Sequence, residues 1–274
     1  NLLKKHTMKV CIIGCGYVGR AAALKWKAEG HEVTVTTRSL EKAYQLRPIA
    51  DLVYILNDDW RELIKDQDVI LLSVAPDNSS DYLQTYLGSA EMLVKALRPC
   101  HGQQIIYTGS TSIYGDHQGE WVDEQSKPKP HNSQAEILLA TEKTLLKAAK
   151  DHKICLFRLG EIYGPGRSIA NRVEKMQGKQ IPGTGENYTN LVHLEEIMRA
   201  IDLAMKNSLQ GVYNLCNDIH IKRKALYQSI CEQNAWPFVQ WYTCNTQTLH
   251  GGNKRVTNTK LKSVGWEPLN IQNW

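Results

Sequence analysis

Short apolar runs alternate with helical stretches through the first 160 residues, and this alternation constrains the fold more than any other feature. The predicted strands cover residues 9–13, 31–36, 51–55, 68–73, 103–108 and 153–158. Helical sequence separates them, for example at residues 21–28 and 40–46. Strands that are apolar along their whole length indicate a parallel sheet covered by helices on both faces. Right-handed crossovers then predict a doubly wound α/β fold.

The alternation of strands and helices stops after Arg158. Turn-rich segments follow at residues 163–166 and 182–185, then one helix at about 194–205 and one strand at 211–215. A change of this kind indicates a second, smaller lobe at the C-terminus. The expected sheet domain comprises residues 1–160, with 191–220 returning to it, and the expected lobe comprises residues 161–190 and 221–274.

Composition narrows the class of protein. The chain of 274 residues has 33 basic and 28 acidic residues, and this net charge of +5 is too small and too dispersed to indicate nucleic-acid binding. The longest apolar runs, residues 52–56 and 69–72, are far shorter than the roughly 18 residues of a membrane span. No signal peptide is predicted near the N-terminus, where Met8 is typical of a native start.

The cysteines are seven, an odd number, and no two of them form a CxxC pair. Several lie within apolar runs, as Cys11 does. We therefore interpret them as small buried side chains in a reducing compartment, by default the cytoplasm, and predict neither a disulfide framework nor a metal site. The seven are Cys11, Cys15, Cys100, Cys155, Cys216, Cys231 and Cys244.

A GxGxxG motif follows the first predicted strand directly and opens the first helix. Gly14 permits a tight turn, Gly16 lets the backbone approach a pyrophosphate, and Gly19 lets the helix pack on the strand. The amides of Tyr17 and Val18 lie at the helix N-terminus, which attracts anions. We therefore predict a dinucleotide-binding loop in a Rossmann-type fold, with a glycine-rich turn that binds no ligand as the alternative.

The residues after the second strand indicate which dinucleotide binds. An NAD site usually has an acidic residue about 20 residues after the first glycine, whereas this chain has none there before Glu41. Thr37 and Arg38 offer instead a hydroxyl and a guanidinium, which suit a 2′-phosphate. The sequence thus favours NADP over NAD, unless Arg38 is a solvated residue at a helix start. Further cofactor contacts are expected after later strands, at Val74, Ala75 and Gly160.

Five motifs follow one another along the chain: GCGYVG, TGSTSIYGD, LFRLGEIYGPGR, NLVHLEEI, and KRVTNTKL with VGWEP. In this order they resemble the signatures of the extended short-chain dehydrogenase/reductases, which are the NAD(P)-dependent epimerase/dehydratase superfamily. Their spacing resembles the atypical branch, and the resemblance extends from about Met8 to Pro268. It implies a Rossmann domain with a seven-stranded sheet, a C-terminal substrate lobe and, often, nucleotide-sugar substrates.

The usual catalytic set of that family is a Ser or Thr together with the Tyr and Lys of a YxxxK motif. The resemblance places the Ser/Thr at Ser110 and the YxxxK on the next helix, which a predicted capping box, Ser133 to Glu136, marks. The matching positions hold Gln134 and Leu138, and no tyrosine in the chain has a lysine four residues later. Loss of a positioned acid or base costs about 10²- to 10⁴-fold in rate, so redox turnover needs another group.

Few residues could replace the missing pair. Tyr114 is close in sequence to the predicted catalytic serine, although a packed tyrosine is the alternative. Tyr163 and Arg167 belong to a turn after the sixth strand and are expected to line the substrate crevice or to have a structural role. His193 is a candidate for substrate contact or proton transfer, and its counterpart in the family usually braces the substrate lobe.

A basic pair near the C-terminus, Lys254 and Arg255, could hold an acidic substrate group such as a diphosphate. The alternative is an exposed, solvated pair. Beyond a small-molecule substrate, the one macromolecular partner that we expect is a second copy of the chain, in a homodimer.

Two hypotheses of different classes follow. In the first, the chain is an NADP-dependent oxidoreductase or epimerase-like enzyme that acts on a small polar substrate such as a nucleotide-sugar. Ser110 then bonds the reacting oxygen, and a group outside the family motif moves the proton. In the second, the chain is a non-catalytic NADP(H)-binding sensor or scaffold, because the YxxxK pair is absent. A lyase-like enzyme without redox turnover is a third reading.

Overall fold

The computed structural model describes residues 6–243 and 252–274, so Cys244 and residues 1–5 lie outside the described residues. The chain divides into two compact units. Unit 1 comprises Asn1–Gly109, Ile137–Phe157 and Ile201–Val212. Unit 2 comprises Ser110–Glu136, Arg158–Ala200 and Tyr213–Trp274. The two units therefore interleave along the chain, and the division into a cofactor domain and a substrate lobe stays a prediction.

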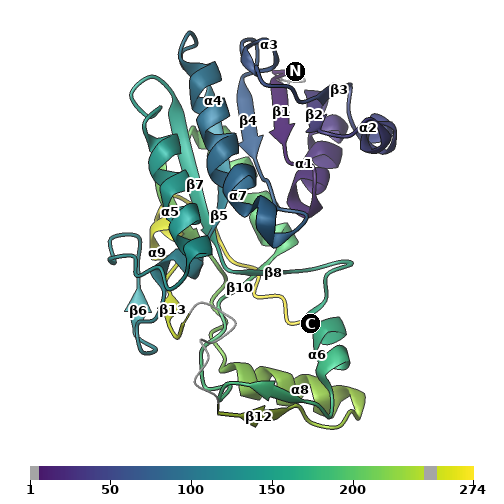
Figure 1. The fold of residues 1–274 in the computed structure, drawn as a ribbon, viewed down its shortest axis with the longest axis vertical. Helices are drawn as coiled ribbons and strands as arrows, with labels where there is room; N and C mark the ends of the chain where they lie inside the picture. The colour runs from purple at the N-terminus through teal and green to yellow at the C-terminus, as the bar shows by residue number, and fades with distance from the viewer. Residues whose placement is uncertain (1–5, 244–251) are drawn as a thin grey trace, which may run out of the picture. The chain divides into compact units, whose positions relative to one another are not determined.

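The central sheet has seven strands among the described residues, in the order β11-β7-β5-β4-β1-β2-β3 (Figure 1). The strands are β1 (Lys9–Ile13), β2 (Glu32–Thr37), β3 (Leu52–Ile55), β4 (Val69–Leu72), β5 (Gln104–Ser110), β7 (Lys153–Leu159) and β11 (Gly211–Leu215). β1 pairs in parallel with β2 and with β4, β2 with β3, and β4 with β5. The chain order reverses between β1 and β4, which confirms the predicted Rossmann-type doubly wound fold.

Both faces of this sheet are buried at its central strand β1, as the apolar strands predict, whereas the edge strand β3 is partly exposed. On one face, Cys11 and Ile13 belong to a core that also contains residues of α3 (Arg61–Ile64), α4 (Ser89–Leu97) and α5 (Ser133–Leu146). Val10 and Ile12 alternate with them and are also fully buried, so they face the other side. There Ile12 lies against α1 (Tyr17–Ala28), whose Lys25 forms an ion pair of 2.9 Å with Asp202 of α7 (Leu194–Asn207).

Helix α5 begins at Ser133, where the sequence predicts it, but its cap is different. The Oδ1 of Asn132 accepts a hydrogen bond of 2.8 Å from the backbone N–H of Ala135. Asn132 therefore occupies the N-cap position, and the predicted capping box of Ser133 and Glu136 is wrong. The reason is physical, because an Asn side chain satisfies the first amides of a helix as well as a Ser does.

Unit 2 is built from short elements. Its parallel strand pairs are β8 (Glu161–Tyr163) with β10 (Leu191–His193), β9 (Gln180–Pro182) with β12 (Gln240–Tyr242), and β6 (Trp121–Val122) with β13 (Arg255–Val256). Its further helices are α6 (Ile169–Met176), α8 (Arg223–Asn234) and α9 (Thr259–Ser263). Val173 of α6 and Leu226 and Ile230 of α8 form part of a separate core. Neither here nor elsewhere in residues 6–243 and 252–274 is a helix long and apolar enough to span a membrane.

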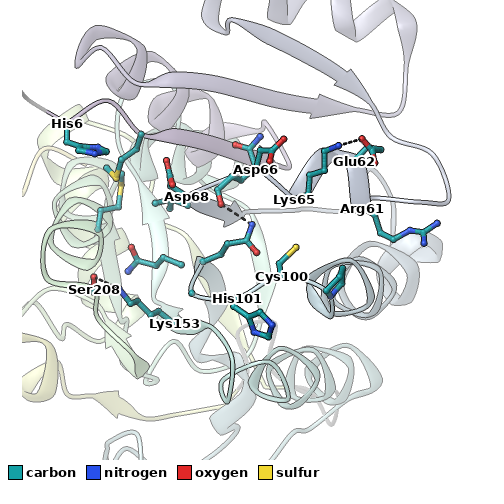
Figure 2. Close-up of a pocket in the computed structure, with 18 residues that line it drawn as sticks. His6, Arg61, Glu62, Lys65, Asp66, Asp68, Cys100, His101, Lys153 and Ser208 are labelled. Atoms are coloured by element: carbon teal, nitrogen blue, oxygen red, sulfur yellow. Dashed lines mark hydrogen bonds and ion pairs between the residues drawn. The ribbon is translucent and has the colours of Figure 1, made fainter.

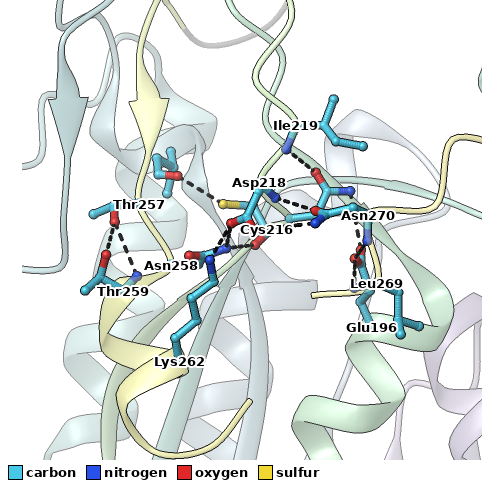
Figure 3. Close-up of polar contacts among 12 residues, drawn as sticks. Glu196, Cys216, Asp218, Ile219, Thr257, Asn258, Thr259, Lys262, Leu269 and Asn270 are labelled. Atoms are coloured by element: carbon cyan, nitrogen blue, oxygen red, sulfur yellow. Dashed lines mark hydrogen bonds and ion pairs between the residues drawn. The ribbon is translucent and has the colours of Figure 1, made fainter. Parts of the chain in front are cut away.

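A buried carboxylate fastens the C-terminal segment within unit 2 (Figure 3). Glu196 is fully buried, and its Oε1 accepts hydrogen bonds from the backbone N–H groups of Leu269 (2.9 Å) and Asn270 (3.0 Å). Its Oε2 accepts another from the N–H of His193, at 2.8 Å. A buried charge needs this many donors to offset its lost hydration. Glu196 therefore holds the last residues of the chain against the start of α7.

Candidate functional site

The glycine motif forms the turn between β1 and α1. Gly14 has a φ of +92°, and a Cβ on it would lie 2.4 Å from the carbonyl oxygen of Ser73. A Cβ on Gly19 would lie 2.2 Å from the carbonyl oxygen of Gly14. The fold itself therefore requires glycine at both positions, because the surrounding backbone leaves no space for a side chain.

Gly16 is different, because no described atom lies within 4 Å of the Cβ that another residue would carry there. The residue is exposed, and its φ of −87° lies outside the left-handed region that favours glycine. Packing within the described chain thus gives no reason for a glycine at this position. A ligand that lies against the backbone does give one.

The first turn of α1 suits an anion. Gly16 is the N-cap residue and has no side chain to cap the first amides, and the turn contains no acidic residue. The first hydrogen bond of the helix joins the N–H of Arg20 to the carbonyl of Gly16 (2.8 Å), so Tyr17 and Val18 lie at the positive end of the helix dipole. Burial raises the pKa of Cys15 to about 11, so the loop adds no thiolate charge. These features fit a pyrophosphate.

Thr37 and Arg38 lie where β2 ends. Thr37 is buried, and its Oγ1 accepts a hydrogen bond from the N–H of Ser39 (3.2 Å). Ser39 in turn caps α2 (Leu40–Leu46) by accepting from the N–H of Lys42 (3.3 Å). Both hydroxyls therefore stabilise the turn, whereas Arg38 between them is exposed. Of the two predicted residues, Arg38 is the one placed to meet a phosphate.

The other predicted cofactor contacts are Val74 and Ala75 in unit 1 and Gly160 in unit 2. Val74 is half-buried and Ala75 is exposed, directly after β4. The preceding residue, Ser73, donates its N–H to the carbonyl of the last residue of β1 (2.9 Å), so this segment lies beside the glycine loop. Gly160 belongs to unit 2, where a Cβ would lie 2.4 Å from the carbonyl oxygen of Asn190. Packing alone therefore accounts for Gly160.

Ser110 is the last residue of β5 and caps the short 3₁₀ helix Thr111–Tyr114. Its Oγ accepts a hydrogen bond from the N–H of Ser112 (3.1 Å) and donates one to the Oγ of Ser112 (2.9 Å). The side chain is half-buried, so a substrate can still reach the hydroxyl. The turn explains why a serine stands here, and its catalytic role stays a prediction.

Tyr114 is fully buried. Its hydroxyl donates a hydrogen bond to the Oδ1 of Asn214 (2.7 Å) and accepts one from the Nη1 of Arg158 (2.9 Å). Burial raises the pKa of Tyr114 to about 12, although the Arg158 charge opposes this shift. A tyrosine that exchanges protons near neutrality needs a lowered pKa and an open hydroxyl. The geometry therefore favours the alternative reading of a packed tyrosine, and the catalytic role remains an untested prediction.

Helix α5 holds no acid or base at the positions that match the family motif. Gln134 is exposed, and Leu138 is buried. Neither an amide nor an alkyl side chain transfers a proton at neutral pH. Proton transfer in this protein therefore needs a group from another segment.

Two of the predicted substrate contacts are buried within unit 2. The hydroxyl of Tyr163 donates to the carbonyl of Ile271 and accepts from the Nδ2 of Asn217. The Nδ1 of His193 accepts a hydrogen bond from the N–H of Glu195 (3.1 Å), and its ring lies edge-on to that of Tyr163, with the centroids 5.1 Å apart. These contacts fit a bracing role, and contact with a substrate stays a prediction for both.

The basic side chains of unit 2 differ in exposure. Arg167 is exposed on a turn, where its contact with a substrate stays a prediction. Lys254 is only 3% exposed, so the alternative of a solvated pair is wrong for this residue. Burial lowers the pKa of Lys254 to about 8. The guanidinium of Arg255 lies between the rings of Trp121 and Tyr188, 5.0 and 4.9 Å from their centroids.

His131, two residues before α5, is not singled out by the sequence. Its ring is half-buried, and its Nδ1 is buried with no hydrogen-bond partner among the described residues. The Nε2 lies 3.1 Å from the Nδ2 of Asn132. Burial and the charge of Lys254 both lower the pKa of His131. A lone histidine in a loop belongs to no spacing motif, so only the fold brings it to notice.

A pocket of about 920 Å³ lies in unit 1 (Figure 2), and no residue of the glycine loop lines it. It is lined by residues at the amino ends of β1, β4, β5 and β7, with charged side chains of both signs such as Lys65, Asp68 and Lys153. Ligands of doubly wound sheets bind at the carboxyl ends of the strands. This pocket is therefore not the candidate cofactor site.

The cysteines form no evident reactive centre. No disulfide joins the six within the described residues to one another, and burial raises the pKa values of Cys11 and Cys216. In residues 6–243 and 252–274, no group of three or more His, Cys, Asp or Glu side chains could hold a metal ion.

Comparisons with known proteins agree with the fold and the loop. Residues 10–216 match the model of the NAD dependent epimerase/dehydratase family. The chain is 31% identical over 230 residues to Protein YeeZ of Escherichia coli (strain K12), which covers 80% of this chain and 81% of that protein.

Two solved structures share the fold. A UDP-glucuronic acid 4-epimerase from Bacillus cereus, in complex with UDP-glucuronic acid and NAD, has a TM-score of 0.80 at 15% identity, over 96% of this chain and 95% of that one. A functionally unknown conserved protein from Silicibacter pomeroyi DSS has a TM-score of 0.76 at 22% identity, over 97% and 95%. At these identities, the two structures show the fold alone.

Proposed function

The chain belongs to the NAD dependent epimerase/dehydratase family, and from this premise we propose that it is an NADP(H)-dependent oxidoreductase or epimerase-like enzyme. Its substrate is a small polar molecule. Nucleotide-sugars are the first class to test, since the similar Bacillus cereus epimerase is in complex with UDP-glucuronic acid. In this proposal, Ser110 at the end of β5 donates a hydrogen bond to the reacting oxygen.

Gly16 is the observation that carries the proposal. The fold requires Gly14 and Gly19 for its own packing, whereas packing among the described residues does not require Gly16 and a bound ligand would. In the bound state, Gly16, Tyr17 and Val18 hold the pyrophosphate at the start of α1, and the dinucleotide supplies or accepts a hydride. The loop therefore fits a nicotinamide dinucleotide.

Arg38 supports NADP as the specific dinucleotide. We expect calorimetry to show tighter binding of NADPH than of NADH. Arg38→Asp should remove that preference by weakening NADPH binding about 10- to 150-fold, which corresponds to the roughly 1.5–3 kcal/mol of one charged hydrogen bond. Arg98→Asp, an exposed residue at the end of α4, is the matched control and should leave both affinities unchanged. Equal affinities of the wild type for the two cofactors would contradict the NADP assignment.

Hydride transfer tests the enzymatic part of the proposal. Single-turnover experiments can be run across a panel of nucleotide-sugars. One series uses NADPH deuterated at the transferred position, and the reverse series uses NADP with the deuterated substrate. We expect transfer to at least one member, and a fall of about 10²- to 10³-fold in Ser110→Ala if its hydroxyl stabilises the reacting oxygen. A Ser110→Ala variant as fast as the wild type would remove this residue from the reaction.

A non-catalytic NADP(H) sensor or scaffold is the second candidate. The observations that favour it are Gln134 and Leu138 in the positions of the family's acid–base pair, together with the buried, fully bonded hydroxyl of Tyr114. A sensor would bind NADPH with the same dependence on Arg38 and would transfer hydride to no substrate. The two experiments above therefore separate the candidates.

A further inference from the structure

The segment from Leu269 to Trp274 is held in different ways before and after Asn270. Before this point, the Oε1 of the buried Glu196 accepts hydrogen bonds from the N–H groups of Leu269 (2.9 Å) and Asn270 (3.0 Å) (Figure 3). The Oδ1 of Asn270 also accepts one from the N–H of Asp218 (2.9 Å). Hydrogen bonds to a carboxylate are roughly twice as strong as those between neutral groups. These contacts therefore fix the backbone as far as Asn270.

Residues 271–274, which we call the strap, lie against Tyr163 and the start of α6. The carbonyl of Ile271 accepts a hydrogen bond from the hydroxyl of Tyr163. The backbone oxygen of Trp274 accepts another from the N–H of Ala170 (3.2 Å). Ala170 and Trp274 are both half-buried, so water can compete for this second bond. The end of the strap is therefore easier to release than the segment that Glu196 holds.

Asn270 has a backbone conformation that suits a hinge. Its φ is +52°, in the left-handed region that Asn enters more readily than most residues. Hinges are a few residues that absorb a large change in φ and ψ while the segments on either side keep their structure. A change of ψ at Asn270 would move the strap and leave the bonds to Glu196 in place.

The strap covers a side chain that the sequence predicts to contact a substrate. Tyr163 is fully buried, and the ring of Trp274 lies against its own, with the centroids 5.4 Å apart. The strap also accepts the hydrogen bond of the N–H of Ala170, which lies in the first turn of α6, where a helix provides no partner of its own. Displacing the strap would therefore free an O–H donor and an N–H donor in the same part of unit 2.

We propose that the strap is an autoinhibitory cover, whose two backbone oxygens occupy the donors that a substrate rich in oxygen acceptors must reach. This inference rests on the proposed function and on the predicted contact between Tyr163 and the substrate. A closed strap lowers the apparent affinity for the substrate, because binding is reduced to the fraction of molecules whose site is open. Loosening the strap should therefore tighten substrate binding.

Amide hydrogen exchange of the full chain, followed by NMR, tests the hinge without a substrate. We expect the protection factor of the Ala170 amide to be at least about 10-fold lower than those of Leu269 and Asn270, because the strap opens without the segment before it. Trp274→Ala should lower the protection of Ala170 a further 2- to 10-fold or about that, which is the worth of one aromatic pair, and leave the other two amides unchanged.

Asn273→Ala, at an exposed position of the strap, is the matched control and should change none of the three protection factors. Similar protection of all three amides in the wild type would overturn the hinge. An equal loss of protection at all three in Trp274→Ala would overturn it as well, since the strap would then move only together with the segment before it.

A second measurement separates this inference from the proposed function. In the hydride-transfer assay, the KM for the nucleotide-sugar that reacts should fall about 2- to 10-fold in Trp274→Ala. It should stay unchanged in Trp274→Phe, which keeps an aromatic ring against Tyr163, and the Kd for NADPH should be the same in both variants. An unchanged or higher KM in Trp274→Ala overturns the inference and leaves the proposed function intact. A wild type that transfers hydride to no nucleotide-sugar contradicts the proposed enzyme and with it the autoinhibitory role.

Discussion

Alanine substitutions at Gly14 and Gly16 should have opposite effects, because the fold requires the first glycine and, in the proposed function, the dinucleotide requires the second. In Gly14→Ala, the new Cβ lies 2.4 Å from a backbone carbonyl oxygen, at a φ of +92°. The left-handed backbone costs an alanine about 1–2 kcal/mol, and overpacking adds about 1–3 kcal/mol. The free energy of unfolding should therefore fall by about 2–5 kcal/mol.

Gly16→Ala should leave the free energy of unfolding within about 0.5 kcal/mol of the wild type, because its Cβ meets no described atom. The same methyl group enters the space of the pyrophosphate, and losing one charged hydrogen bond costs about 1.5–3 kcal/mol, or about 10- to 150-fold in the Kd for NADPH. Urea unfolding measures the first quantity and calorimetry the second. A Gly16→Ala variant that is destabilised as much as Gly14→Ala but binds NADPH normally would refute the reasoning.

Three further substitutions test the packing of unit 2. Tyr114→Phe removes the partner of the buried Arg158, so urea unfolding should show a loss of about 1–3 kcal/mol, while a loss of NADPH binding would contradict a purely structural role. Glu196→Gln replaces a carboxylate that accepts three backbone N–H groups, and we expect a loss of about 2–3 kcal/mol in the same assay. The pKa of Lys254 is lowered in the folded state, so between about pH 8 and 10.5 the unfolded chain binds more protons than the folded one. The unfolding free energy of the wild type, measured relative to Lys254→Met, should therefore rise by about 2–3 kcal/mol from pH 7 to pH 10, and a flat difference would contradict the burial of the amine.

Local patterns in the sequence predict the sheet well. The apolar runs place β1 at its observed residues, Lys9–Ile13, and Gly211–Leu215 is predicted as a strand and forms β11. The first of them is easily recognised because β1 is buried on both faces and so contains consecutive apolar residues. Helix α1 begins at Tyr17, as the glycine motif predicts, whereas the apolar pattern alone indicates helical sequence only from residue 21. A helix boundary that depends on backbone geometry is harder to predict from composition than a strand that is buried in the core.

Some features of the candidate site can likewise be predicted from local sequence, and others depend on long-range contacts. The GxGxxG loop is predictable because Gly14 and Gly19 are required by the backbone close to them. The partners of Tyr114 are not, since Arg158 and Asn214 lie 44 and 100 residues further along the chain. From the sequence, Lys254 could be an exposed residue, whereas in the structure it is buried by segments that are distant in sequence. Long-range contacts of this kind decide which titratable groups are buried, and spacing motifs in the sequence do not record them.

The stretches of chain that make up unit 2 all begin in the central sheet. Each one starts inside a strand of the central sheet, at Ser110 in β5, Arg158 in β7 and Tyr213 in β11. Unit 2 is therefore an assembly of three excursions, and no single cut in the chain releases it as one fragment. Insertions in any excursion can reshape unit 2 while the strands stay as they are, so this unit can change without any change in the glycine loop.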